Sequence, residues 1–134
     1  MSSTLTVTNL TTTNVTATNL TDGAGTTSTF ANINSGSAKA WAFADGTGTA
    51  SISDSQNISG ITDNGTGDYT FSFSNNMGNA TYGGGSAAAS SQANGQNFQL
   101  HIFATGSIRT RAENASGTLT DCSRLVFNIQ GDLA

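Results

Sequence analysis

The chain of 134 residues has no proline, a single cysteine and only four cationic side chains. A lone cysteine excludes an internal disulfide framework, and we interpret Cys122 as a small, half-buried residue of a late strand. Four cations against eight carboxylates leave a net charge of -4. The chain therefore offers no basic surface for nucleic acid and no polybasic patch for an anionic membrane.

Residues that favour helices are also scarce. Lys, Glu and Arg together number five, whereas glycine alone numbers 16, and Ser, Thr and Asn are abundant. Thr and the aromatic residues favour strands, and Gly and Asn favour the turns between them. The composition predicts an all-β protein.

Large apolar residues are few. Leu, Ile, Val and Phe make up 24 of the 134 residues, a fraction of about 18% at which composition begins to suggest disorder. Disorder usually accompanies a high charge density, and charged residues are only 9% here. Several chains that pool their small apolar faces into one core would reconcile these two observations. We therefore expect an obligate oligomer.

No segment has the pattern of an export signal or a membrane span. The first nine residues, MSSTLTVTN, lack the charged and apolar regions of a signal peptide. No apolar run approaches the length of a transmembrane helix. We expect synthesis in the cytosol, without secretory export and without membrane insertion.

An internal repeat fills the first 21 residues. The pentads VTNLT, TTNVT and ATNLT follow one another over residues 7–21. With the residues before them they place an apolar side chain at every fifth position, at Leu5, Leu10, Val15 and Leu20. This period fits neither a flat strand nor an α-helix, but it fits a β path that turns every few residues. We interpret residues 1–21 as a stalk in which three chains bury this apolar row, with a disordered or surface-docked arm as the alternative.

A β domain follows a connector at residues 22–38. Over residues 39–134, segments with alternating apolar and polar side chains are separated by Asp-Gly, Asn-Gly and Ser-Gly turns. This pattern predicts an antiparallel sandwich or jelly-roll-like domain, and residues 81–91 are either a glycine-weakened strand or a loop. The expected apolar faces are Trp41 and Phe43; Tyr69, Phe71 and Phe73; Phe98, Leu100 and Ile102; and Leu125, Phe127 and Ile129.

The segment DNGTGD, residues 63–68, places two carboxylates around a glycine-rich run and resembles a calcium loop at first sight. An EF-hand loop needs oxygen ligands at alternate positions and a bidentate acid downstream, and Gly65 and Gly67 supply no side-chain oxygen. An Asn-Gly pair between two apolar runs is instead a strong hairpin signal. We predict a hairpin here and no metal site.

No arrangement of residues points to catalysis. The single histidine, His101, lies within an expected strand, and no spacing links it to a serine and an aspartate in a triad. The rings of Trp41 and Tyr82 have the shape to stack on a sugar, yet Trp41 is more typical of a core residue. We therefore predict no catalytic residue, cofactor or metal, and interpret His101 as structural.

Two stretches carry a recognisable set of motifs. Residues 38–82 contain KAW at 39–41, FADGTGT at 43–49 and NISGITDNGTGDYTFSF at 57–73. Residues 106–131 form two expected strands around the turn Asn-Ala-Ser-Gly. Together these stretches resemble the C-terminal β module of tail-fibre and other virion proteins of tailed bacteriophages. The sequence departs from that module at Gly78, where a proline is usual.

The resemblance implies a trimeric, non-enzymatic component of the virion, made in the host cytoplasm and assembled with other tail or capsid proteins. As a short fibre or appendage, it would contact a glycan or protein of the host surface through exposed loops such as residues 83–95. The alternative is a capsid decoration (cement) or head-fibre protein that stabilises the head, with its arm lying across capsid subunits. The module usually ends much longer chains, whereas here it begins after only 38 residues. We therefore expect it to be a small self-standing part.

Overall fold

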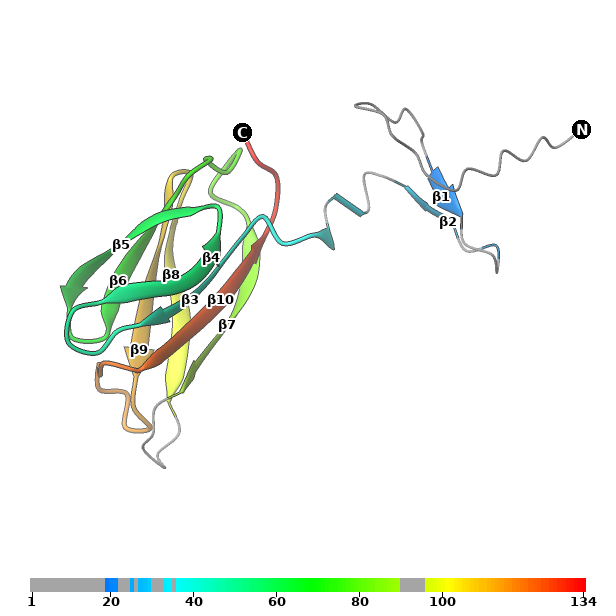
Figure 1. Cartoon of the computed structure of the whole chain (residues 1–134). Coiled ribbons are helices and arrows are strands. Elements are labelled where there is room, and N and C mark those ends of the chain that lie inside the picture. Colours follow the sequence, from blue (N-terminus) through cyan, green and yellow to red (C-terminus); the bar gives the residue numbers. More distant parts are fainter. Residues whose placement is uncertain (1–18, 22–24, 26, 30–32, 35, 90–95) are drawn as a thin grey trace, which may run out of the picture. The chain divides into compact units, whose positions relative to one another are not determined.

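The computed structural model of the protein describes residues 19–21, 25, 27–29, 33–34, 36–89 and 96–134. The chain divides into two compact units, Met1–Asn34 and Ser35–Ala134. In the first unit, β1 (Asn19–Thr21) and β2 (Thr27–Thr29) form a two-stranded antiparallel sheet (Figure 1). Among the described residues, no helix is long and apolar enough to span a membrane.

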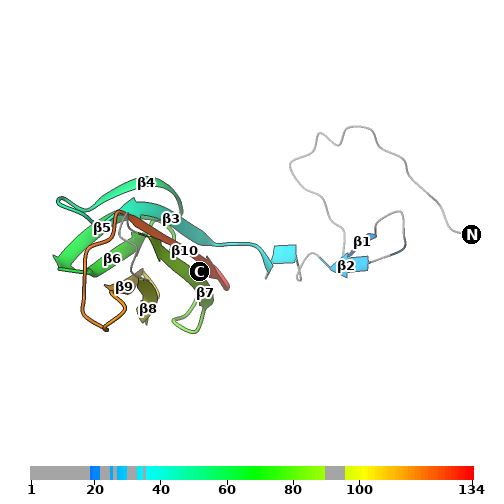
Figure 2. The same ribbon diagram turned by 90° about the horizontal axis from the view of Figure 1, so that it is seen from below.

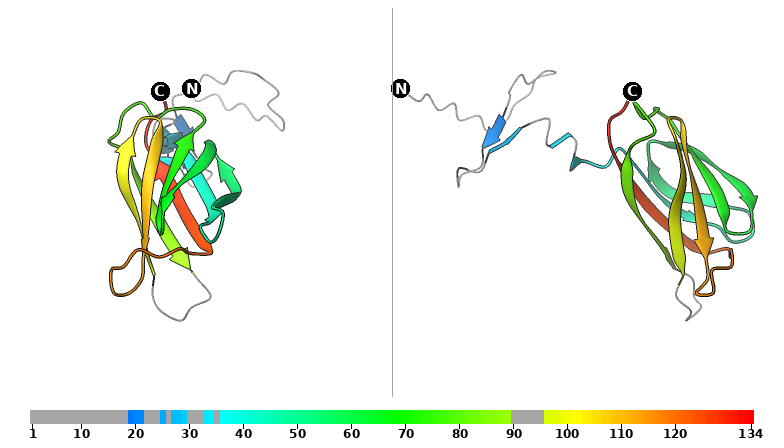
Figure 3. Two further views of the ribbon diagram at one scale, coloured as in Figure 1. Left: turned by 90° about the vertical axis from the view of Figure 1, so that its left-hand side faces the viewer. Right: turned by 180° about the vertical axis from the view of Figure 1, so that it is seen from behind.

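The second unit consists of two four-stranded antiparallel sheets packed face to face, as Figure 2 and Figure 3 show. The strand order is β4-β3-β10-β7 in the first sheet and β5-β6-β9-β8 in the second. The strands are β3 (Ala40–Asp45), β4 (Ser51–Gln56), β5 (Ile58–Gly65), β6 (Asp68–Phe73), β7 (Gly83–Ala89), β8 (Asn97–Ala104), β9 (Ser107–Glu113) and β10 (Arg124–Gln130). This arrangement confirms the expected all-β antiparallel sandwich, and β7 resolves the alternatives for residues 83–89 in favour of a strand.

The chain passes between the two sheets several times. The hairpins β3–β4, β5–β6 and β8–β9 each stay within one sheet, whereas the other connections cross to the opposite sheet. At the crossing from β4 to β5, Asn57 has a φ of 56°, a conformation that asparagine tolerates better than most residues. Its side-chain oxygen accepts the N–H of Asn75 at 2.7 Å and its amide donates to the carbonyl of Asn75 at 3.0 Å. These bonds hold the crossing in place.

The core lies between the two sheets. On β6, the side chains of Tyr69, Phe71 and Phe73 are buried, and β10 contributes Leu125, Phe127 and Ile129. The rings of Phe71 and Phe127 meet edge to face across the interior, with centroids 4.8 Å apart. Both strands therefore confirm the faces that alternation predicts. Each large apolar side chain buried in this way contributes about 1.5–3 kcal/mol to the stability of the folded domain.

Strand β3 faces the opposite way from our expectation. Its three inward residues are Ala40, Ala42 and Ala44, which are at most 1% exposed, while Trp41 is half-buried and Phe43 is 38% exposed on the outer face. The interpretation of Trp41 as a core residue is therefore wrong. The physical reason is space, because the rings contributed by β6 and β10 fill the interior and leave room for little more than methyl groups on β3.

An irregularity in β8 reverses its faces. Leu100 and Ile102 pair with consecutive residues of β9, so that His101 is an extra residue that forms a bulge. Phe98 before the bulge and Phe103 after it pack against the core, whereas Ile102 is 47% exposed. The expected shared face of Phe98, Leu100 and Ile102 is therefore wrong at Ile102, because one extra residue shifts the alternation of every side chain after it.

Candidate functional site

Two rows of side chains cross the outer face of the sheet β4-β3-β10-β7. The register of the strands places neighbours in each row directly opposite one another. The first row consists of Gln56, Trp41, Asn128 and Gly85, and the second of Asp54, Phe43, Val126 and Ala87. In both rows the largest side chain is on β3 and the smallest is on β7.

A groove of about 520 Å³ lies over these rows, within the usual volume range of small-molecule sites. The aromatic rings of Trp41 and Phe43 on β3 form one wall of the groove. On β7, Gly85 and Ala87 have small side chains or none, so that side of the groove has almost no wall. The hollow thus follows from the fall in side-chain size across the sheet. The groove is lined by Trp41, Ala42, Phe43, Gly85, Ser86, Ala87, Val126, Phe127 and Asn128.

The apolar side chains of the groove are unusually accessible. Phe43 is 38% and Val126 is 40% exposed, and the two residues are cross-strand partners. The outer face of a solvated antiparallel sheet normally carries polar residues. Neighbouring exposed apolar side chains next to a half-buried indole instead mark a surface for interaction.

Two carboxamides flank the indole and are held in fixed orientations. The indole N–H of Trp41 donates to the side-chain oxygen of Gln56 at 2.9 Å, and the backbone N–H of Gly85 donates to the side-chain oxygen of Asn128 at 2.9 Å. Both donors are N–H groups that cannot accept a hydrogen bond. Each carboxamide must therefore turn its oxygen toward that N–H group and its NH₂ group away from it. Within the described part of the chain, the structure gives neither amide NH₂ group a partner. The indole therefore has a hydrogen-bond donor on each side, Asn128 within the lining of the groove and Gln56 on β4 just beyond it.

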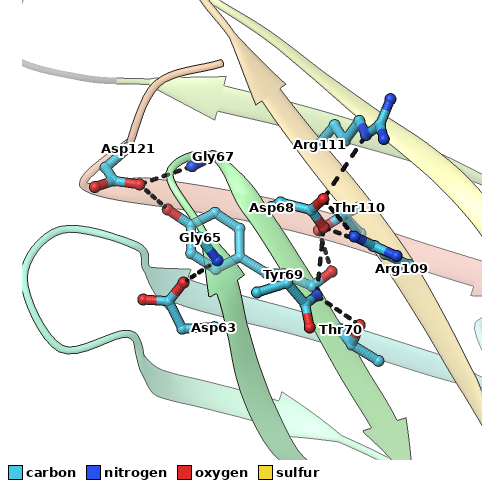
Figure 4. A network of polar contacts seen from close by, with 11 residues as sticks. Asp63, Gly65, Gly67, Asp68, Tyr69, Thr70, Arg109, Thr110, Arg111 and Asp121 are labelled. Atoms are coloured by element: carbon cyan, nitrogen blue, oxygen red, sulfur yellow. Dashed lines mark hydrogen bonds and ion pairs between the residues drawn. The ribbon is translucent and has the colours of Figure 1, made fainter.

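A second group of polar side chains lies beside the β5–β6 hairpin (Figure 4). Arg109 of β9 donates through Nε and Nη2 to the two carboxylate oxygens of Asp68 on β6, both at 2.7 Å. The hydrogen bonds from Arg109 hold the pKa of Asp68 below its ordinary value, against the opposing effect of burial. Because the guanidinium occupies both oxygens of a carboxylate whose side chain is only 10% exposed, we interpret this pair as structural.

Asp121 joins the same hairpin to the segment before β10 (Figure 4). Its Oδ1 accepts the backbone N–H of Gly67 at 2.8 Å and lies 2.7 Å from the hydroxyl of Tyr69, which is also 2.9 Å from the carbonyl of Gly46. Burial, and then the hydrogen bond to Asp121, raise the pKa of the Tyr69 hydroxyl. The phenol therefore stays protonated and connects the two sheets at this end of the sandwich.

The segment at residues 63–68 is a hairpin, as the sequence predicts. Gly65 at the end of β5 pairs with Asp68 at the start of β6, and Thr66 and Gly67 form the turn between them. The side chain of Asp63 accepts the N–H of Gly65 at 2.8 Å. Nowhere in the described residues do three or more His, Cys, Asp or Glu side chains gather in a way that could hold a metal ion.

Of the apolar row predicted for the stalk, Leu5, Leu10 and Val15 lie outside the described residues, and Leu20 belongs to β1. The trimeric stalk therefore stays a prediction.

The other residues singled out in the sequence have different surroundings. The hydroxyl of Tyr82 is bonded to the carbonyls of Ala104 and Ser107 and the ring is only 7% exposed, so it does not offer a face to a ligand. His101 is exposed at the β8 bulge. Cys122 is fully buried just before β10 rather than half-buried within a strand.

The groove itself was not predicted, although the sequence holds a signal for it. The residues of β10 that alternate with its apolar core face include Val126 and Asn128, and those of β3 that alternate with alanines are Trp41 and Phe43. Strand β3 is apolar on both faces and must expose one of them unless something covers it, and Val126 adds an apolar side chain on the outer face of β10.

No protein-family model, no curated protein and no solved structure matches the chain. A proposal for its function therefore rests on the groove, on the fold and on the resemblance of residues 38–82 and 106–131.

Proposed function

We propose that the protein is a non-enzymatic structural component of a tailed-bacteriophage virion, a short fibre or appendage that contacts the host surface. The observation that carries this proposal is the groove beside Trp41, which places accessible aromatic and apolar side chains on the outer face of a sheet. A domain with a purely scaffolding role would gain nothing from exposing these side chains to water.

The resemblance to virion modules supplies the class of protein. The motifs KAW and FADGTGT lie in and just after β3, and the motif at residues 57–73 covers β5, the hairpin turn and β6. An all-β sandwich agrees with the fold that this resemblance implies. It provides a rigid support from which loops and sheet faces can bind other molecules.

Assembly as a homotrimer is part of the proposal. The low content of large apolar residues and the pentad repeat with Leu5, Leu10, Val15 and Leu20 support it. Three copies on one appendage, and several appendages on one virion, would multiply a weak contact into stable attachment to the cell.

The location of the protein on the virion tests the proposal. Particles of the phage proposed to encode the chain are labelled with gold-conjugated antibody raised against the full-length protein, and imaged by electron microscopy. Label at the tail tip or on projecting fibres is the expected result. Label spread over the head would instead establish a capsid decoration or head-fibre protein. Purified particles without any label would contradict a place in the virion.

A further inference from the structure

We propose that the groove over β3, β10 and β7 binds a neutral pyranose sugar. Its apolar ring face stacks on Trp41, and its hydroxyl oxygens accept hydrogen bonds from the side-chain NH₂ groups of Gln56 and Asn128. The inference deepens the host-contact role proposed above and rests on it for the biological source of the sugar.

The aromatic part of the groove is complementary to the apolar face of a sugar ring. A pyranose ring presents several C–H groups on one face, which makes that face apolar and flat. Trp41 lines the groove with a half-buried indole whose N–H is already bonded to Gln56. The ring is therefore held in position at the groove, where a sugar can stack on it. Phe43 and Val126 extend the apolar surface along the next row.

The carboxamides of Gln56 and Asn128 are complementary to the hydroxyl groups of a sugar. Around the apolar face of a sugar, hydroxyl oxygens project near the plane of the ring and accept hydrogen bonds from amides. The oxygen of Gln56 accepts from the indole of Trp41 and that of Asn128 from the backbone of Gly85. The two NH₂ groups are therefore turned away from these partners and can donate to a ligand. Because these residues are the two cross-strand neighbours of Trp41, one ring stacked on the indole lies within reach of both.

The charge of the region favours a neutral ligand. None of the residues that line the groove carries a charge. Beyond the lining, Asp54 lies opposite Phe43, and the oppositely charged Arg124 lies two residues before Val126 on the same exposed side of β10. The lining therefore offers no cation to pair with a nucleotide, a sugar phosphate or an acidic sugar, whereas a neutral sugar needs none.

A second copy of the chain fits the groove less well. An apolar surface pressed onto Phe43 and Val126 would also cover the NH₂ groups of Gln56 and Asn128. Buried donors without acceptors destabilise an interface. A sugar supplies an apolar face and acceptors at its edge in one molecule, and the groove volume of about 520 Å³ lies in the range of small-molecule sites.

The fluorescence of Trp41 provides a direct test, because the sequence contains one tryptophan. The full-length protein is titrated with the methyl pyranosides of glucose, galactose, mannose and N-acetylglucosamine, with N-acetylneuraminic acid as the charged comparison. Saturation-transfer difference NMR on the same samples reports contact with the sugar ring protons. We expect at least one neutral pyranoside to change the emission of Trp41 in a saturable way, and to receive saturation on one ring face.

Two variants locate the site, and one serves as the matched control. Asn128→Asp replaces the NH₂ donor by an acceptor of the same size, and Ala87→Leu fills the low side of the groove; both residues are exposed. We expect each change to weaken binding at least tenfold. Asn79→Asp introduces the same charge in a turn where the oxygen still accepts the N–H of Thr81, and should leave the affinity unchanged. Circular dichroism confirms that every variant is folded.

Several outcomes would overturn the inference. They are the absence of binding by any neutral pyranoside in both measurements, binding that survives Asn128→Asp and Ala87→Leu, and emission that depends on protein concentration alone. The last result would assign the groove to contacts between copies. These experiments use purified protein, so their failure would leave the place in the virion to be decided by imaging, and a failure of the imaging would leave sugar binding intact.

Discussion

Trp41 on β3 donates a hydrogen bond of 2.9 Å from its indole N–H to the side-chain oxygen of Gln56 on the neighbouring strand β4. This bond fixes the largest outward side chain of the sheet before any ligand arrives. A ring that is already ordered loses little conformational entropy when a partner stacks on it. The hydrogen bond therefore holds the half-buried indole of Trp41 in place at the groove that it lines.

The orientation of β3 predicts opposite effects for two adjacent residues. Ala42→Leu places a large side chain between the sheets, where Ala42 is 1% exposed, and should lower the free energy of unfolding by about 1–3 kcal/mol. Phe43→Ala changes more atoms than Ala42→Leu does, but on the outer face of the sheet. It should therefore lower the free energy of unfolding by less than about 1 kcal/mol. Urea unfolding of both variants measures the difference. A larger loss for Phe43→Ala than for Ala42→Leu would mean that the strand faces the other way.

Two adjacent glycines of β7 form a second matched pair. A Cβ added at Gly84 would clash with the backbone oxygen of Asn128 on β10, whereas a Cβ added at Gly83 meets nothing. Gly84→Ala should therefore destabilise the domain by about 3 kcal/mol or more, because backbone cannot move aside as a side chain can. Gly83→Ala should leave the stability of the domain unchanged or raise it by about 0.5 kcal/mol, because alanine lowers the conformational entropy of the unfolded chain. Equal melting temperatures for the two variants would rule out the close packing of β7 on β10.

The pair of Asp68 and Arg109 predicts a loss of stability in acid. The pKa of Asp68 in the folded protein is below its ordinary value of 3.8. Its contribution to stability is therefore present at pH values above 3.8 and is lost as the pH falls through the lower pKa of the folded protein. Asp68→Asn should be less stable than the wild type at pH 7, and the difference should shrink as the pH is lowered below 4. Asp132→Asn, an exposed carboxylate near the C-terminus, serves as the control. If the difference in unfolding free energy between wild type and Asp68→Asn were the same at pH 7 and pH 3, the charge of Asp68 would not contribute to stability.

The pentad repeat predicts that assembly and folding can be separated. Replacing Leu10 and Leu20 with Asp introduces charges into the row that three chains would bury, and burying unpaired charges is strongly unfavourable. We expect native mass spectrometry to show a trimer for the wild type and a monomer for the double variant, with the circular dichroism of the β domain unchanged. A double variant with the mass of the wild type would contradict the stalk.

The sequence predicted the strands well, because alternation and turn residues are local signals. The alternating rings of β6 and the apolar face of β10 lie in the core as expected, and the hairpin before β6 is present. The side of β3 could not be predicted, because alternation defines two faces and the choice between them depends on what the opposite sheet supplies. Rings from β6 and β10 fill the interior, so the alanines of β3 turn inward and Trp41 and Phe43 turn outward.

Two further features depend on pairing that the sequence does not reveal. The bulge at His101 is visible only when β8 is aligned with β9, and it moves Phe103 inward and Ile102 outward. The groove requires β7 to lie beside β10 so that Gly85 and Ala87 are next to Asn128 and Val126. Sequence alone identified the aromatic residues but not the neighbours that make a site of them.

Competition at the host surface tests the central claim, that the groove beside Trp41 contacts the cell. Full-length protein is added to bacteria before the phage proposed to encode it, and the fraction of adsorbed phage is measured. Wild-type protein should block adsorption, as should Leu119→Ala, which changes an apolar side chain 37% exposed outside the groove, whereas Trp41→Ala should block at least tenfold less well. Equal blocking by Trp41→Ala and the wild type, or no blocking by any of the three, would contradict the account.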